Sequence, residues 1–143
     1  MARYTTTVSS PRTPEDAFLF MADFRNVESW DPGVSRVVQV AGEGPGPDAT
    51  YDVEVSGRVV RYEVREYVPS TRVVFAAETP RVWIRDVIEV SSTSPGSAVL
   101  YDATVELKGF WAVANPLLSV AFKRMGDKAA AGLVRALGVA SSA

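Results

Sequence analysis

The apolar residues of this 143-residue chain follow two different periods. Near the C-terminus they recur at steps of three and four, which places them on one stripe of a helix. That stripe comprises Leu118, Ala121, Phe122, Met125, Ala129, Leu133 and Ala136. Asn115 can cap this helix and Pro116 suits its first position, so the pattern predicts a helix over 115–137. At about 1.5 Å per residue it would run roughly 33 Å, about the width of a small domain.

Upstream of this helix the period is two. Tyr4, Thr6 and Val8 alternate with polar neighbours and predict a first strand. The same alternation, bounded by glycine, proline and serine turns, predicts further strands at 34–41, 51–55, 60–65, 72–78, 82–90 and 98–108. Six or seven strands with short connections indicate an antiparallel meander, and the alternation of polar and apolar positions indicates a sheet that is wetted on one face.

Two short helices are predicted between the first and second strands. Thr13 is a typical cap, Pro14 fits the first helical position, and Asp16 lies three residues after the cap. Residues 26–30 fit one more helical turn, and the Asp-Pro-Gly sequence at 31–33 ends it. The element order is a strand, two helices, five or six strands and a long helix. We therefore expect one α+β domain over 1–143.

Composition narrows the chemistry. The net charge is −2 without a basic run, which argues against a nucleic-acid partner. The chain has no cysteine and no histidine, so thiolate sites, cysteine nucleophiles and Ser-His-Asp catalysis are excluded. We expect no metal and no cofactor. The N-terminus lacks the apolar core of a signal peptide and no apolar window could span a membrane, so we expect a cytoplasmic location.

Several segments in register resemble one family. Residues 10–18 are similar to the start of its first helix, and 26–33 to its Trp-containing segment. Residues 107–110 and 115–118 are similar to its Lys-Gly bend and its Pro-Leu-Leu helix start. These segments resemble the polyketide cyclase/dehydrase branch of the START-like, Bet v 1-like (SRPBCC) superfamily. The resemblance implies a helix-grip fold, in which the sheet wraps around the last helix and leaves a cavity for an apolar or aromatic ligand.

Such a cavity would be lined by inward strand positions and by the helical stripe. The candidate ligand-binding residues are Trp30, Tyr51, Tyr62, Phe75, Ile84, Asp86, Tyr101, Leu118, Phe122 and Met125. Tyrosine hydroxyl groups could orient a polar end of the ligand. The alternative is a filled core, in which Trp30 anchors its short helix to the sheet.

Asp86 is the one candidate catalytic residue. It shares strand parity with Val82, Ile84, Ile88 and Val90, which would place a carboxylate among apolar neighbours and raise its pKa. Such a group could act as a general acid or base or hold a ligand hydroxyl group. The strand is apolar on both faces, however, so the opposite orientation, with Trp83 and Val87 inside and Asp86 in water, stays open.

Three functions remain. The first is binding of a small hydrophobic or aromatic molecule, lipid-like or polyketide-like. The second is a polyketide cyclase or dehydratase that uses carboxylate and tyrosine groups, and the third is a filled-core interaction module. Whether the protein is an enzyme, which molecule it binds and whether it forms a homodimer stay open.

Gly126 and Gly132 inside the last helix suggest a close approach of another element, room for a ligand, or mild helix weakness.

Overall fold

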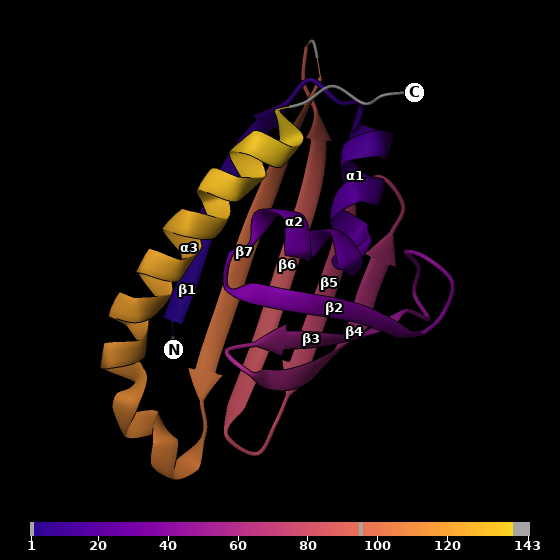
Figure 1. Cartoon of the computed structure of the whole chain (residues 1–143). Helices are drawn as coiled ribbons and strands as arrows, with labels where there is room; N and C mark the ends of the chain where they lie inside the picture. The colour runs from indigo at the N-terminus through magenta and orange to yellow at the C-terminus, as the bar shows by residue number, and fades with distance from the viewer. Residues whose placement is uncertain (1, 95, 139–143) are drawn as a thin grey trace.

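The computed structural model describes residues 2–94 and 96–138 (Figure 1). Seven antiparallel strands form one sheet in the order β1-β7-β6-β5-β4-β3-β2. The strands are β1 (Ala2–Ser10), β2 (Val34–Ala41), β3 (Thr50–Val55), β4 (Arg58–Val68), β5 (Arg72–Glu78), β6 (Val82–Ser92) and β7 (Ser97–Leu107). The helices are α1 (Pro14–Ala22), η1 (Phe24–Asn26), α2 (Val27–Trp30), η2 (Gly109–Ala114) and α3 (Asn115–Leu137). The predicted α+β helix-grip fold is confirmed.

The sheet is strongly curved. Figure 1 shows β2 and β3 running across the direction of β6 and β7. The pairing register shifts between Val34 and Arg36 and between Gln39 and Ala41 in β2, and between Val64 and Glu66 in β4. Such bulges bend a strand and increase its twist. The concave face therefore curves around the space next to α2 and α3.

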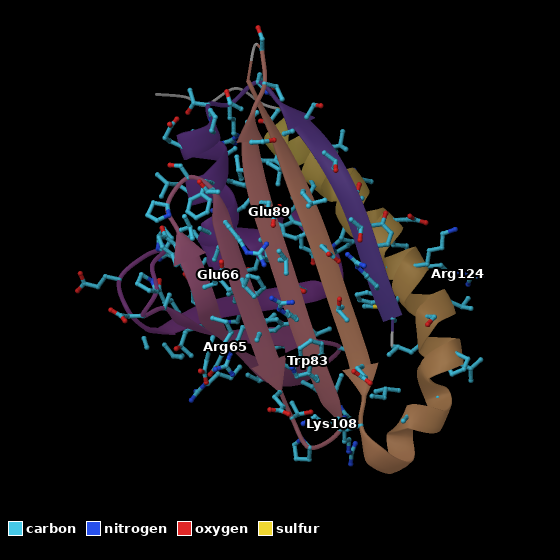
Figure 2. The ribbon with its side chains drawn as sticks, turned by 180° about the vertical axis from the view of Figure 1, so that it is seen from behind. Arg65, Glu66, Trp83, Glu89, Lys108 and Arg124 are labelled. Carbon is cyan, nitrogen blue, oxygen red and sulfur yellow. The ribbon has the colours of Figure 1, made fainter. Side chains whose placement is uncertain are left out.

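Burial along β6 decides which face of that strand points inward. Asp86, Ile88 and Val90 share one face of the strand, and all three are buried. Trp83 and Glu89 lie on the opposite, convex face, which Figure 2 views directly. The orientation that places Asp86 in water is therefore wrong, because this strand directs its carboxylate into the concave side.

Ion pairs between neighbouring strands cover the convex face. Arg3 pairs with Asp102 at 2.7 Å across β1 and β7, and Arg61 pairs with Asp52 at 2.8 Å across β4 and β3. Exposed pairs of this kind contribute little to stability. They mark the wetted face and leave the apolar positions to the other side.

The helix pair before β2 forms as the sequence predicts. The backbone N–H of Asp16 donates to Thr13 Oγ1 at 3.2 Å, which caps α1. Phe18 on α1 is fully buried and meets the Tyr67 ring edge-on at 5.4 Å. The helix pair thereby closes one end of the concave face.

Helix α3 has the predicted length but docks differently from the predicted stripe. Its cap residue is Ala114 rather than Asn115, because the 3₁₀ turn η2 leads directly into the helix. Ala121 and Met125 are exposed, whereas Ala129, Leu133 and Leu137 are buried. Figure 1 shows the reason: the C-terminal half of α3 lies along β1, and the N-terminal half continues past the start of β1.

Two glycines allow α3 to approach its neighbours. A Cβ at Gly126 would lie 2.3 Å from the Tyr4 ring, and a Cβ at Gly132 would lie 1.8 Å from the carbonyl oxygen of Trp30. Close approach of other elements therefore explains both glycines. Tyr4 also donates to Asp127 at 2.8 Å, which adds a polar contact between β1 and α3.

Candidate ligand-binding cavity

A cavity of about 270 Å³ lies between the concave face of the sheet and helices α2 and α3. Strands β2, β3, β4, β6 and β7 supply most of its wall, and most of the lining is apolar. The lining residues are Phe24, Val27, Trp30, Asp31, Gly33, Val34, Val53, Val55, Arg58, Val60, Tyr62, Ile84, Asp86, Tyr101, Ala103, Val105, Leu118, Phe122 and Met125. The core is therefore not filled at the junction of sheet and helix.

Most of the candidate ligand-binding residues meet at this cavity. Its wall includes Trp30, Tyr62, Ile84, Asp86, Tyr101, Leu118, Phe122 and Met125. Tyr51 and Phe75 do not belong to the lining, although both are fully buried on inward positions. They pack instead against Phe24, whose ring lies 5.8 Å from the Tyr51 ring and 4.4 Å from the Phe75 ring.

Phe24 from η1 explains this separation. Its ring also lies 4.9 Å from the Tyr62 ring, so it stands between a filled aromatic core and the cavity. On the other side of the cavity, Trp30 meets Tyr101 edge-on at 5.4 Å. Trp30 is thus both an anchor of α2 and part of the wall, which unites the two interpretations of this residue.

Asp86 is a buried carboxyl group on the wall. Its side chain lines the cavity and only 6% of the residue is exposed. It makes no hydrogen bond or ion pair with any residue in the described part of the chain. Burial, and then the negative charges of Asp31 and Asp102, raise the pKa of Asp86 to about 7. A carboxyl group of this kind is about half ionised near neutral pH.

Asp31 places a second carboxylate on the wall. Its Oδ1 accepts a hydrogen bond from the backbone N–H of Gly33 at 2.9 Å, which holds it in the turn after α2. Burial raises the pKa of Asp31, and burial also raises the pKa values of Tyr62 and Tyr101 well above the usual tyrosine value. This side of the cavity therefore disfavours further negative charge.

Sequence reasoning missed several wall residues for which a signal existed. Val53 and Val55 share strand parity with Tyr51, Val60 with Tyr62, and Ala103 and Val105 with Tyr101. Alternation alone could have found them. Phe24, Asp31 and Val34 had no such signal, because their positions depend on the turn after α2 and on the bulge in β2.

A surface groove of about 660 Å³ adjoins the cavity. Arg58, Val60, Val105 and Leu118 line both spaces. Arg58 is exposed and begins β4, and Leu118 belongs to the N-terminal half of α3. This groove offers a route between the cavity and the surface.

Among the described residues, no group of three or more acidic side chains could hold a metal ion. In the same part of the chain, no helix is long and apolar enough to cross a bilayer.

Comparisons with known proteins agree with this architecture. A START superfamily protein from Mycobacterium smegmatis has a TM-score of 0.72 at 17% identity, with 95% of each chain covered. A protein from Thermus thermophilus has a TM-score of 0.71 at 19% identity, again with 95% of each chain covered. At these identities the likeness concerns the fold alone.

A third similar structure is the di-domain ARO/CYC protein StfQ from the steffimycin biosynthetic pathway. It has a TM-score of 0.70 at 14% identity, and the match covers 94% of this chain. The present chain spans about half of StfQ, 48% of its length. No curated protein matches the sequence. The family model described as polyketide cyclase/dehydrase and lipid transport matches residues 1–138, so the chain belongs to that family and has its START-like fold.

Proposed function

We propose that the protein binds a small hydrophobic or aromatic molecule, lipid-like or polyketide-like, in the cavity between the sheet and α3. The observation that carries this proposal is the apolar cavity of about 270 Å³. An apolar cavity of roughly 150 Å³ suffices to take up benzene. Burying the apolar surface of a ligand contributes about 25 cal/mol per Å², before the cost of association is subtracted.

The family description and the groove support the same proposal. The family description names lipid transport beside cyclase and dehydrase activity, and lipids are largely apolar molecules. The groove that shares Arg58, Val60 and Leu118 with the cavity is the route by which such a molecule would enter.

Filling the cavity from within tests this function. Ala103 on β7 is buried and lines the cavity from the concave face of the sheet. We expect Ala103→Leu to lose at least about 90% of the affinity for any lipid or aromatic molecule that the wild type binds, because the added side chain occupies the same space. Thermal shift against a panel of fatty acids and polycyclic aromatics, followed by calorimetric titration of the hits, measures this loss.

The matched control is Ala98→Leu on the same strand. Ala98 has the opposite parity and lines a groove on the convex side, away from the cavity. The Ala98→Leu variant should bind the same molecules with the affinity of the wild type. Equal affinity in both variants, or a wild type that binds nothing in the panel and carries no adduct in a native mass spectrum, would contradict the proposal.

One observation favours acid–base catalysis as a second candidate function. The pKa of Asp86 is raised to about 7, close to the value at which a group can both accept and donate a proton at neutral pH. Under this alternative, Asp86→Asn abolishes cyclisation of a poly-β-carbonyl substrate, followed by absorbance, while binding of that substrate remains. Turnover at the wild-type rate in this variant would exclude Asp86 as the acid or base.

A further inference from the structure

The charged groups of the cavity are distributed unevenly. Asp86 and Asp31 both line its wall, and the former is 6% exposed and unpartnered among the described residues. The cationic residue of the described lining is Arg58, which is exposed and also belongs to the surface groove. The buried part of the cavity therefore contains negative charge without a protein cation beside it.

A buried carboxylate is costly unless it is paired and hydrogen-bonded. Neighbouring side chains normally provide that pairing. Here the inward neighbours along β6 are Ile84 and Ile88, and the residue opposite Asp86 on β7 is Ala103. None of the three has a polar side chain. The hydroxyl groups of Tyr62 and Tyr101 line the same cavity but make no hydrogen bond to Asp86 in the described part of the chain. A donor supplied by the contents of the cavity would satisfy the carboxylate.

The aromatic residues of the wall point to the charge of that donor. Trp30, Tyr62 and Tyr101 line the same cavity as Asp86, and Trp30 lies edge-on to Tyr101 at 5.4 Å. The faces of such rings attract cations, and ammonium groups are recognised by aromatic side chains that surround them. Carboxylates together with aromatic rings form a site that suits a protonated amine better than an anion or a neutral group.

We infer that the ligand is an organic amine: an apolar, ring-containing molecule whose protonated nitrogen lies beside Asp86 among Trp30, Tyr62 and Tyr101. This inference rests on the proposed function and narrows its ligand class. The ammonium group donates a hydrogen bond to the Asp86 carboxylate, and the apolar part fills the remaining cavity toward Leu118 and Phe122.

The pairing makes affinity depend on pH. An ammonium group pairs with the ionised form of Asp86, whose pKa is about 7, so affinity for the amine should rise as pH increases through this value. An alkylamine, with a pKa near the value of about 10.4 for lysine, stays protonated over this range. The titratable groups around Asp86 do not reverse this trend. Asp31 on the cavity wall is acidic, as is Asp102 on the opposite face of the sheet, and Tyr62 and Tyr101 on the wall stay neutral because their pKa values are raised.

Three probes with one skeleton test the inference: 2-naphthylmethylamine, 2-naphthylmethanol and 2-naphthoate, which are cationic, neutral and anionic at pH 8. Each is titrated calorimetrically into the wild type, Asp86→Asn and Asp52→Asn at pH 8 and pH 5.5. Asp52 is the matched control, because its carboxylate lies on the convex face and pairs with Arg61.

We expect the wild type at pH 8 to bind the amine at least about tenfold more tightly than the alcohol, and the naphthoate most weakly. The preference should fall below about threefold at pH 5.5 and in Asp86→Asn, and persist in Asp52→Asn. Circular dichroism checks the fold of each variant. Should Asp86→Asn not fold, the pH dependence of the wild type decides.

The results separate this inference from the proposed function. Equal binding of amine and alcohol, or tightest binding of the naphthoate, overturns the amine assignment and leaves apolar binding standing. A preference for the amine that survives in Asp86→Asn overturns the role of Asp86. Failure of all three probes to bind counts against both the ligand class and the binding function.

Discussion

At the scale of single residues, Asp86 shows how strand parity and burial together set the chemistry of a side chain. Its side chain points to the face of β6 opposite to Arg85 and Val87. Ile88 and Val90 share that face, and their burial places the Asp86 carboxyl group on the concave side. Burial then raises the pKa from 3.8 to about 7. The same residue on the convex face would pair with an arginine, as Asp52 and Asp102 do.

This shift has a consequence for stability. A carboxyl group whose pKa is higher in the folded state holds more protons there than in the unfolded state between pH 4 and pH 7, so stability falls as pH rises through that range. We expect Asp86→Asn to remove this loss. Relative to the wild type, the free energy of unfolding of the variant should increase by about 4 kcal/mol from pH 4 to pH 8, as measured by urea unfolding.

The difference between the two proteins is the relevant quantity, because other carboxyl groups act in the opposite sense. Arg61 and Arg3 lower the pKa values of Asp52 and Asp102, which makes both proteins more stable as pH rises. These contributions cancel in the comparison. Parallel pH profiles for the wild type and Asp86→Asn would show that the Asp86 carboxyl group titrates normally.

At the scale of elements, α3 has two halves with different surroundings. Ala129, Leu133 and Leu137 in its C-terminal half are buried. In its N-terminal half, by contrast, Leu117 is 76% exposed and Val120 is 60% exposed, and only the side that carries Leu118 and Phe122 faces the cavity. The C-terminal half therefore anchors the helix, and the N-terminal half forms part of the wall beside the groove.

The anchor depends on the contact between α2 and α3. Alanine favours a helix over glycine by up to about 1 kcal/mol, so Gly132→Ala would stabilise an isolated helix. In the fold, its Cβ would overlap the carbonyl oxygen of Trp30 at 1.8 Å, a backbone atom that no rotamer change can move. We expect Gly132→Ala to lower the free energy of unfolding by about 3 kcal/mol in urea denaturation.

Gly46→Ala is the matched control. Gly46 has no neighbour within 4 Å of its would-be Cβ and does not have a positive φ, so the change should stay within about 0.5 kcal/mol. A stabilised Gly132→Ala variant would mean that α2 and α3 lie farther apart than described.

At the scale of the whole molecule, the curved sheet and α3 do not close completely against each other, and a cavity remains between them. Bulges in β2 and β4 bend the sheet around the cavity, and α3 closes only part of the concave side. A void of this size removes packing contacts that the fold would otherwise gain. A ligand that fills the void would restore those contacts and stabilise the folded state by mass action.

Most of the helices and strands follow from local patterns in the chain. Alternation and turn residues predict strands 34–41 and 72–78 with the bounds that the structure has, and the Thr13 cap correctly marks the start of α1. These features are local, since they depend on neighbours within a few residues in the chain. The helix-grip order follows from them together with the resemblance to the family.

Contacts between distant segments decided the rest. Parity on β6 is ambiguous because both faces are apolar, and only the burial of Ile88 and Val90 placed Asp86 inside. Phe24 separates the aromatic candidates into two groups. It packs beside Tyr51 and Phe75 in the filled core, whereas Tyr62 lines the cavity. A periodic pattern states which residues share a face. How much of that face is covered depends on which distant elements pack against it, and those contacts exist only in the folded molecule.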